Sequence, residues 1–189
     1  MTRQKLLCAG LLAASIGLCL LPGAGFGDAG RSPRCGEVSR APAALTDRQL
    51  RTSVLCLVNA ARERNGLRPL EFNLALRQSA TVHSLSMVRS GSFSHYGPGS
   101  STPTTRVANS GYLSRVSSYR IAENIGAGQG SEYGSPIGMV RMWMHSPPHR
   151  ANILDPGLRD FGVGIARGDV LSGGPDGATY TLDLGARSG

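Results

Sequence analysis

Apolar residues recur at helical spacing between residues 46 and 91 and predict two amphipathic helices. The first begins after Thr46, which can cap it, and ends at Asn65-Gly66. Its apolar positions share one face: Leu50, Val54, Leu57, Val58 and Ala61. The second begins after Asn73 and ends at Gly91. Its inward stripe consists of Leu76, Ala80, His83 and Met87.

His83 is therefore expected to face the interior. A histidine on an apolar helical stripe is more often a hydrogen-bonded core residue than a ligand. Its nearness in sequence to His95 leaves a role in a site open.

The later part of the chain predicts both helix and strand. Residues 136–144 read as a short apolar helix, and Ser146 can cap a further helix that has Pro147 in its first turn. Residues 161–167 and 178–185 alternate as strands, and a glycine-rich hairpin-type connection separates them. Residues 96–120 are dominated by Gly, Pro, Ser and Thr, which predicts surface loops that line or cover a site.

The start of the chain indicates export. Residues 1–27 combine Arg3 and Lys5, an apolar run and a region of small residues, as a secretory signal peptide does. An uncleaved membrane anchor is the alternative, although the apolar run is slightly short for a span. After cleavage roughly 160 residues remain, enough for a single core. We expect an irregular N-terminal arm over residues 28–45, one domain over residues 46–187, and a secreted, extracellular protein with no remaining membrane span.

Two cysteines remain after the leader, Cys35 in the arm and Cys56 in the first helix. In an oxidising compartment we expect them to form a disulfide, which would tie the arm to the domain and contribute roughly 3 kcal/mol. The alternative is two free or separately buried thiols. Neither cysteine belongs to a redox or metal motif.

The basic balance of the chain does not indicate a nucleic-acid binder. The formal net charge is +8 at pH 7. The arginines are scattered, and there is no dense basic run and no recognisable nucleic-acid module. We expect no nucleic-acid partner. The positive charge favours attraction to anionic cell-wall polymers or lipid headgroups, but a role in solubility alone explains the charge equally well.

Three ionisable residues are candidates for a site. His95 and Glu123 each lie among small or apolar neighbours, and His149 falls in the first turn of the helix predicted after Ser146. The positive end of the helix dipole disfavours a second positive charge, so His149 is expected to stay neutral. Two imidazoles and one carboxylate suit a divalent metal, or could serve as acid, base and orienting group. Spacing does not choose between these, and His149 alone could simply hydrogen-bond a neighbouring loop.

Several motifs occur in a characteristic order: F-S-H, G-Y, A-E-N-I-G-x-G, W-M-x-S-P-x-H-R-x-N-I-L, F-G-V-G and Y-T-L-D-L-G. From about Thr46 to Ala186 the chain resembles a bacterial member of the CAP superfamily, which contains cysteine-rich secretory proteins, antigen five and plant pathogenesis-related protein one. The resemblance implies an α+β fold, a single-domain three-layer α-β-α sandwich. Many members gather two histidines and two acidic residues in an open cleft that can hold a divalent cation.

Carried over by motif, His95 matches the first histidine, Glu123 the glutamate and His149 the second histidine of that cleft. The place of the second glutamate holds His145 and Ser146 instead. His145 and His149 have the spacing of a helical metal pair, but two prolines between them interrupt any continuous helix.

We therefore expect a secreted CAP-domain module in which His95, Glu123 and His149 bind one divalent cation (Zn, Ca or Mg) or a small lipid or cell-wall polymer ligand. The alternative is a metal-assisted hydrolase of peptides, lipids or cell-wall polymers that uses the same three residues as catalytic candidates. A purely structural or host-interaction role stays open. Whether the protein is catalytic is not determined, and a monomer is expected. The residues expected to support the motif loops are Asn124, Ser146, Arg150 and Asn152.

Overall fold

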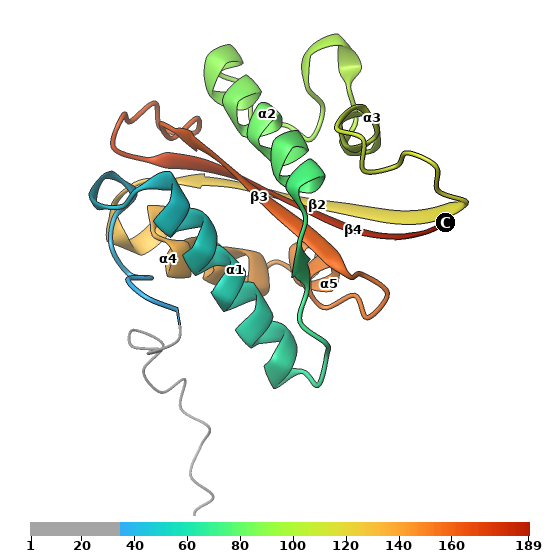
Figure 1. Cartoon of the computed structure of the whole chain (residues 1–189). Coiled ribbons are helices and arrows are strands. Elements are labelled where there is room, and N and C mark those ends of the chain that lie inside the picture. Colours follow the sequence, from blue (N-terminus) through green and yellow to red (C-terminus); the bar gives the residue numbers. More distant parts are fainter. Residues whose placement is uncertain (1–34) are drawn as a thin grey trace, which may run out of the picture.

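A computed structural model describes residues 35–189, which form one sheet with helices on both faces (Figure 1). The predicted signal peptide and the first residues of the predicted arm lie outside the described residues. Among residues 35–189, no helix is both long and apolar enough to cross a membrane.

Four strands form the sheet in the order β1-β3-β4-β2. They are β1 (Glu71–Phe72), β2 (Ser118–Gly128), β3 (Asp160–Arg167) and β4 (Ala178–Ser188). β2 and β4 pair antiparallel along their whole length, with Glu123 opposite Asp183, and β1 runs parallel to the start of β3. The two predicted strands are confirmed as β3 and β4. The sequence pattern did not predict β2, because the second half of this strand is buried and does not alternate between apolar and polar residues.

Helices form the outer layers. α2 (Leu74–Ser90) covers one face, while α1 (Asp47–Arg64), α4 (Pro136–His145) and α5 (Pro147–Ile153) lie on the other (Figure 1). α2 approaches so closely that a Cβ on Gly164 would lie 2.1 Å from the main-chain carbonyl carbon of Ala80. On the opposite face, Val163 belongs to the main core with Val54 and Trp143. The α+β sandwich is confirmed.

The predicted ends of the first two helices are confirmed. The Thr46 hydroxyl accepts from the Gln49 N–H, and the Gln49 side chain accepts from the Thr46 N–H in return. Asn73 caps α2 by accepting from two N–H groups of the first turn. Gly91 ends α2 with φ of 64°, a left-handed conformation that glycine adopts without steric cost.

The prediction of loops throughout residues 96–120 is wrong. A short turn, η3 (Pro98–Ser100), is followed by α3 (Pro103–Asn109), and β2 begins at Ser118. α3 forms because Thr102 and Thr105 make a reciprocal capping box and Pro103 fits the first helical position. The Ser- and Thr-rich composition that suggested a loop therefore includes the capping residues of a helix.

Ser146 precedes α5 as predicted, but the expected side-chain cap is wrong. Its hydroxyl makes no capping hydrogen bond. The Ser146 N–H donates to the carbonyls of Met142 and Trp143, which ends α4, and its own carbonyl accepts from the Arg150 N–H. Ser146 thus joins two helices through its main chain. The connection from β2 to α4 contains one π-helical turn, η4 (Gly130–Gly134).

The predicted disulfide between Cys35 and Cys56 is confirmed, and it ties the arm to α1. The rest of the described arm packs on the domain through buried Val38 and Leu45, with one short 3-10 helix, η2 (Pro42–Ala44). The Val38 carbonyl accepts from the Ile137 N–H at 2.9 Å, so the arm also contacts the start of α4.

Candidate functional site

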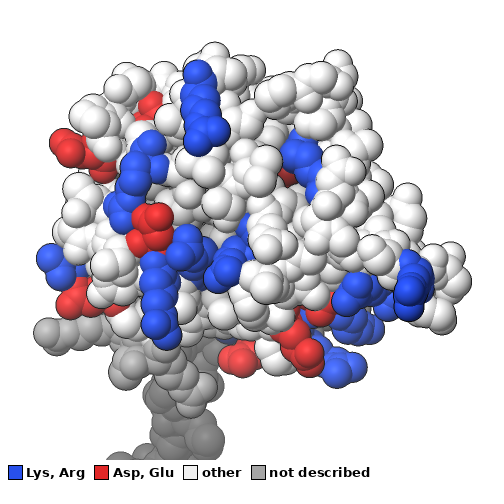
Figure 2. Space-filling model, turned by 45° about the horizontal axis from the view of Figure 1, so that its top comes forward, with Lys and Arg blue, Asp and Glu red and all other residues white. Residues whose placement is uncertain are grey.

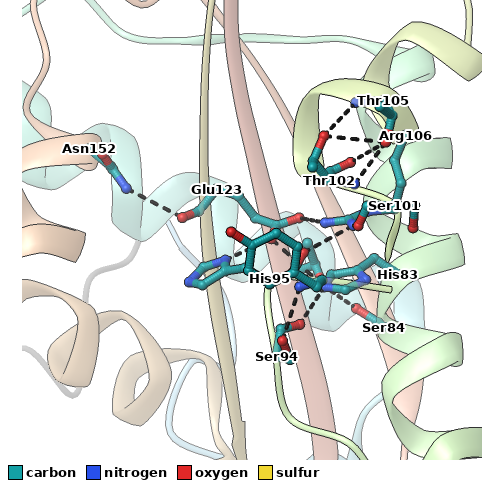
Figure 3. A network of polar contacts seen from close by, with 12 residues as sticks. His83, Ser84, Ser94, His95, Ser101, Thr102, Thr105, Arg106, Glu123 and Asn152 are labelled. Carbon is teal, nitrogen blue, oxygen red and sulfur yellow. Dashed lines mark hydrogen bonds and ion pairs between the residues drawn. The ribbon is translucent and has the colours of Figure 1, made fainter. Parts of the chain in front are cut away.

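Glu123 lies at the centre of a polar network on β2, where chain segments far apart in sequence meet (Figure 3). One carboxylate oxygen, Oε1, accepts from Nδ1–H of His95 at 2.8 Å. The other, Oε2, accepts from Nη2–H of Arg106 at 2.6 Å. The Glu123 side chain is 1 % exposed and the Arg106 side chain 7 %, whereas the His95 side chain is 45 % exposed. The network therefore connects the interior to an exposed imidazole.

Arg106 binds the Glu123 carboxylate and also the main chain next to it in space. Its Nη1 donates to the main-chain carbonyls of Ser101 (2.8 Å) and His95 (3.1 Å). It therefore holds the His95 backbone as well as the Glu123 carboxylate. Sequence reasoning missed Arg106 because it lies in the segment predicted as loops.

The Glu123 contact defines which nitrogen of His95 is available. In the neutral ring, donation from Nδ1–H to the carboxylate leaves Nε2 with its lone pair. Nε2 makes no hydrogen bond within the described residues. His95 thus presents one acceptor nitrogen, in an orientation that a buried ion pair determines.

His83 is the hydrogen-bonded core histidine that its stripe predicts. It is fully buried, and its Nε2 donates to the Ser94 carbonyl at 2.9 Å. Burial lowers the pKa of His83, against the opposing charge of Glu123, whose Oε1 lies 3.7 Å from Nε2. A neutral His83 therefore anchors the residue next to His95.

Asp183 lies opposite Glu123 on β4 and is fully buried. Burial, followed by the charge of Glu123, raises the pKa of Asp183 well above its usual range. For Glu123, burial alone would raise the pKa, but the hydrogen bond from His95 and the charge of Arg106 outweigh burial and lower it. Of these two carboxyl groups, Asp183 therefore keeps its proton to a higher pH than Glu123. Asp183 lies in the Y-T-L-D-L-G motif, but the sequence assigned it no role in the site.

His149 lies in the first turn of α5 and is joined to the Glu123 strand through its main chain. The Asn124 side-chain amide donates to the His149 carbonyl at 3.0 Å. Asn152 in turn donates to Asn124 Oδ1 at 2.9 Å and to the Glu123 carbonyl at 3.3 Å. Two side-chain amides thus attach α5 to β2 beside Glu123.

Burial and then the charge of His95 lower the pKa of His149, which favours its neutral form. The His149 ring makes no hydrogen bond to another described residue. The structure thus brings His95 into direct contact with Glu123, and places the His149 ring where the charge of His95 acts on it.

The remaining residues near the motif take other positions. His145 is exposed, and its Nδ1–H donates to the Arg141 carbonyl of its own helix at 2.8 Å. Arg150 is exposed, and its side chain makes no hydrogen bond or ion pair within residues 35–189. Ser146 contributes only main-chain contacts.

In the part of the chain that the structure describes, no three His, Cys, Asp or Glu side chains are grouped so as to hold a metal ion. Both Glu123 oxygens already accept hydrogen bonds from protein side chains, so its geometry is that of a carboxylate that orients a histidine. A cavity of about 530 Å³ adjoins this network, and its walls include His83, Ser101, Arg106 and Asn109.

Comparison with known proteins gives consistent matches. Residues 55–181 match the family model of the cysteine-rich secretory protein family, CAP. The chain is 37 % identical over 112 residues to the uncharacterized protein YkwD of Bacillus subtilis. That alignment covers 59 % of this chain and 40 % of YkwD, so the chain corresponds to well under two thirds of this relative.

Solved structures show the same fold. An extracellular protein of Bacillus anthracis that contains an SCP domain aligns with a TM-score of 0.59 and 24 % identity, over 74 % of this chain and 43 % of its own. An outer surface protein of Borrelia burgdorferi aligns with a TM-score of 0.62 and 15 % identity, over 76 % of this chain and 97 % of its own.

Proposed function

Because the chain belongs to the cysteine-rich secretory protein (CAP) family, we propose that it is an extracellular binding module whose ligand is held at His95 and His149 through a shared divalent cation. The observation that carries this proposal is the hydrogen bond from His95 Nδ1 to Glu123 Oε1. A carboxylate that accepts from one ring nitrogen orients the other nitrogen for a ligand and raises its basicity.

An extracellular location is supported by three observations. Residues 1–27 have the pattern of a secretory signal. The Cys35–Cys56 disulfide is of a kind that persists in oxidising compartments. The structural neighbours from Bacillus anthracis and Borrelia burgdorferi are described as extracellular and outer-surface proteins.

The donor set favours zinc over calcium or magnesium. Imidazole nitrogens suit zinc, whereas calcium and magnesium prefer oxygen ligands. Residues 35–189 do not supply three protein ligands, so a tightly held structural zinc does not fit. Two imidazole ligands fit a weaker site, which oxygen atoms of a bound ligand would complete. A carboxylate- or phosphate-bearing lipid or cell-wall fragment has such oxygens.

Metal-assisted hydrolysis of peptides, lipids or cell-wall polymers is the second candidate function. It rests on the same Glu123–His95 pair, because a general base is commonly oriented by a third group in this way. Turnover of model esters or peptides that Glu123→Gln abolishes, while zinc binding persists, would favour hydrolysis over binding alone.

Calorimetric titration of the metal-stripped chain from Asp28 onward tests the binding function. We expect saturable binding of one zinc ion, with calcium and magnesium at least about tenfold weaker. The His95→Ala/His149→Ala variant should lose zinc binding. His145→Ala is the matched control and should retain it, because His145 is exposed and bonded within its own helix. Zinc binding that survives in the double variant, or no binding by the parent protein, would contradict the proposal.

A further inference from the structure

A groove separate from the histidine site runs between α1, the start of α2 and the edge of the sheet. It has a volume of about 510 Å³. We call it the arginine groove, and its main lining residues are Arg48, Arg51, Arg77, Leu55, Phe72 and Phe161. Figure 2 shows several basic side chains on this side of the molecule, with acidic side chains beside some of them.

The three arginines of the groove have no anionic partner. Within the described residues, Arg48, Arg51 and Arg77 make no ion pair and no side-chain hydrogen bond. By contrast, Arg167 at the nearby end of β3 is paired with Asp47 at 2.6 Å. Three uncompensated guanidiniums that face one concave surface repel one another, and a ligand with several negative charges relieves that repulsion.

The floor of the groove is apolar and includes an exposed aromatic ring. Phe72 is 55 % exposed although it packs edge-on against the buried Phe161, with ring centroids 6.4 Å apart. The Arg77 guanidinium lies over the Phe72 ring, 5.5 Å from its centroid. Arginine and aromatic side chains together are the composition enriched at the centres of protein interfaces.

From this combination we propose that the arginine groove binds an acidic peptide segment of a partner protein, with one apolar side chain between carboxylates. Several carboxylates match three guanidiniums, each of which can bind a carboxylate through two parallel hydrogen bonds. The apolar side chain would cover the Phe72 ring and Leu55. A fatty acid supplies only one charge for three arginines, and a polyglycerol phosphate has no side chain for the apolar floor, so both match the groove less well.

The proposal is tested with an array of hexapeptides composed of Glu, Gln and Leu in all combinations, probed with the fluorescently labelled chain. Retention should rise with the number of Glu residues and should require at least one Leu. For the best peptide, Arg48→Gln/Arg51→Gln should lower the affinity at least about tenfold, because charge-assisted contacts are lost. Phe72→Gln should weaken binding without changing its salt dependence.

Arg64→Gln/Arg141→Gln is the matched control, because it removes two exposed arginines outside the groove, and it should stay within about twofold of the parent protein. His95→Ala/His149→Ala should bind peptide normally, so failure of the zinc proposal does not affect this one. The proposal would be overturned if no peptide bound, if Gln peptides bound equally well, if both arginine double variants behaved alike, or if polyglycerol phosphate bound more tightly than the best peptide.

Discussion

Replacing Arg106 with methionine should destabilise the fold far more than the loss of an ordinary surface ion pair. In the folded chain Arg106 Nη2 lies 2.6 Å from Glu123 Oε2, with the two side chains 7 % and 1 % exposed. The substitution leaves a buried carboxylate without its cation, and it removes the donor to Glu123 Oε2 and to the His95 carbonyl, whereas the Ser101 carbonyl keeps the Gly97 N–H. Breaking one partner of a buried pair costs about 3–5 kcal/mol of unfolding free energy.

Arg120→Met is the matched control for this experiment. Arg120 Nη1 and Asp155 Oδ2 are 2.7 Å apart, a similar distance, but the Arg120 side chain is 60 % exposed. Water screens such a pair, so its loss should cost at most about 1 kcal/mol. Urea unfolding at pH 7, followed by far-UV circular dichroism, measures both variants.

The pH dependence gives an independent measurement on the same pair. The folded-state pKa of Glu123 is lowered, so its stabilising contribution is present above the unfolded pKa near 4.5 and is lost as the pH falls through the folded value. The charge and hydrogen bond of Arg106 provide part of the decrease in the Glu123 pKa. Without Arg106 that part is absent, so the variant should lose less stability than the wild type when the pH is lowered. Equal losses of stability for Arg106→Met and Arg120→Met at pH 7, with unchanged pH profiles, would mean that the buried Arg106–Glu123 pair stabilises the fold no more than an exposed pair does.

Three further predictions concern groups that determine the shape of the site. The raised pKa of Asp183 means that the folded state holds a proton which the unfolded chain releases. The stability of the wild type therefore falls as the pH rises from the unfolded pKa near 3.8 to the folded pKa. The stability of Asp183→Asn relative to wild type should therefore rise from pH 4 to pH 7, by up to about 1.4 kcal/mol per pH unit, and a constant difference in urea titrations would contradict this. Removing the disulfide by Cys35→Ser/Cys56→Ser, which opens a loop of sequence separation 21, should cost about 3 kcal/mol in unfolding free energy, and an unchanged urea midpoint would argue against a stabilising cross-link. Gly162→Ala would place a Cβ 2.0 Å from the main-chain nitrogen of Arg77 and should lower the melting temperature by at least about 10 °C. Gly173→Ala is the control, because nothing lies within 4 Å of its Cβ, and it should cost only the strain of the positive φ.

Local sequence signals predicted the helices well. Thr46 and Asn73 start α1 and α2, and Gly91 ends α2, because capping depends on neighbouring residues alone. α3 carried the same kind of signal, a Thr102–Thr105 capping box with Pro103 between them, but the Gly-, Pro-, Ser- and Thr-rich surroundings obscured it.

The candidate site was only partly predictable, for reasons of distance along the chain. Motifs identified His95 and Glu123, and the structure joins them across 28 residues. Arg106 lies in no quoted motif, and Asp183 lies in one, Y-T-L-D-L-G, that indicated no role for it. Arg106 reaches Glu123 only because α3 folds next to β2, and Asp183 meets Glu123 only through the register of β2 and β4. Contacts that depend on strand register and helix packing cannot be read from spacing in a single sequence.

Long-range proton–nitrogen NMR of the chain labelled with ¹⁵N in its four histidines shows whether Glu123 orients His95 for zinc. We expect His95 to carry its proton on Nδ1, and added zinc to shift the ring nitrogens of His95 and His149 together. His83, which is buried, and His145, which is bonded to its own helix, serve as internal references and should not shift. A His95 proton on Nε2, or zinc-induced shifts at His145 or His83 in place of His95 and His149, would contradict this role of Glu123 and His95.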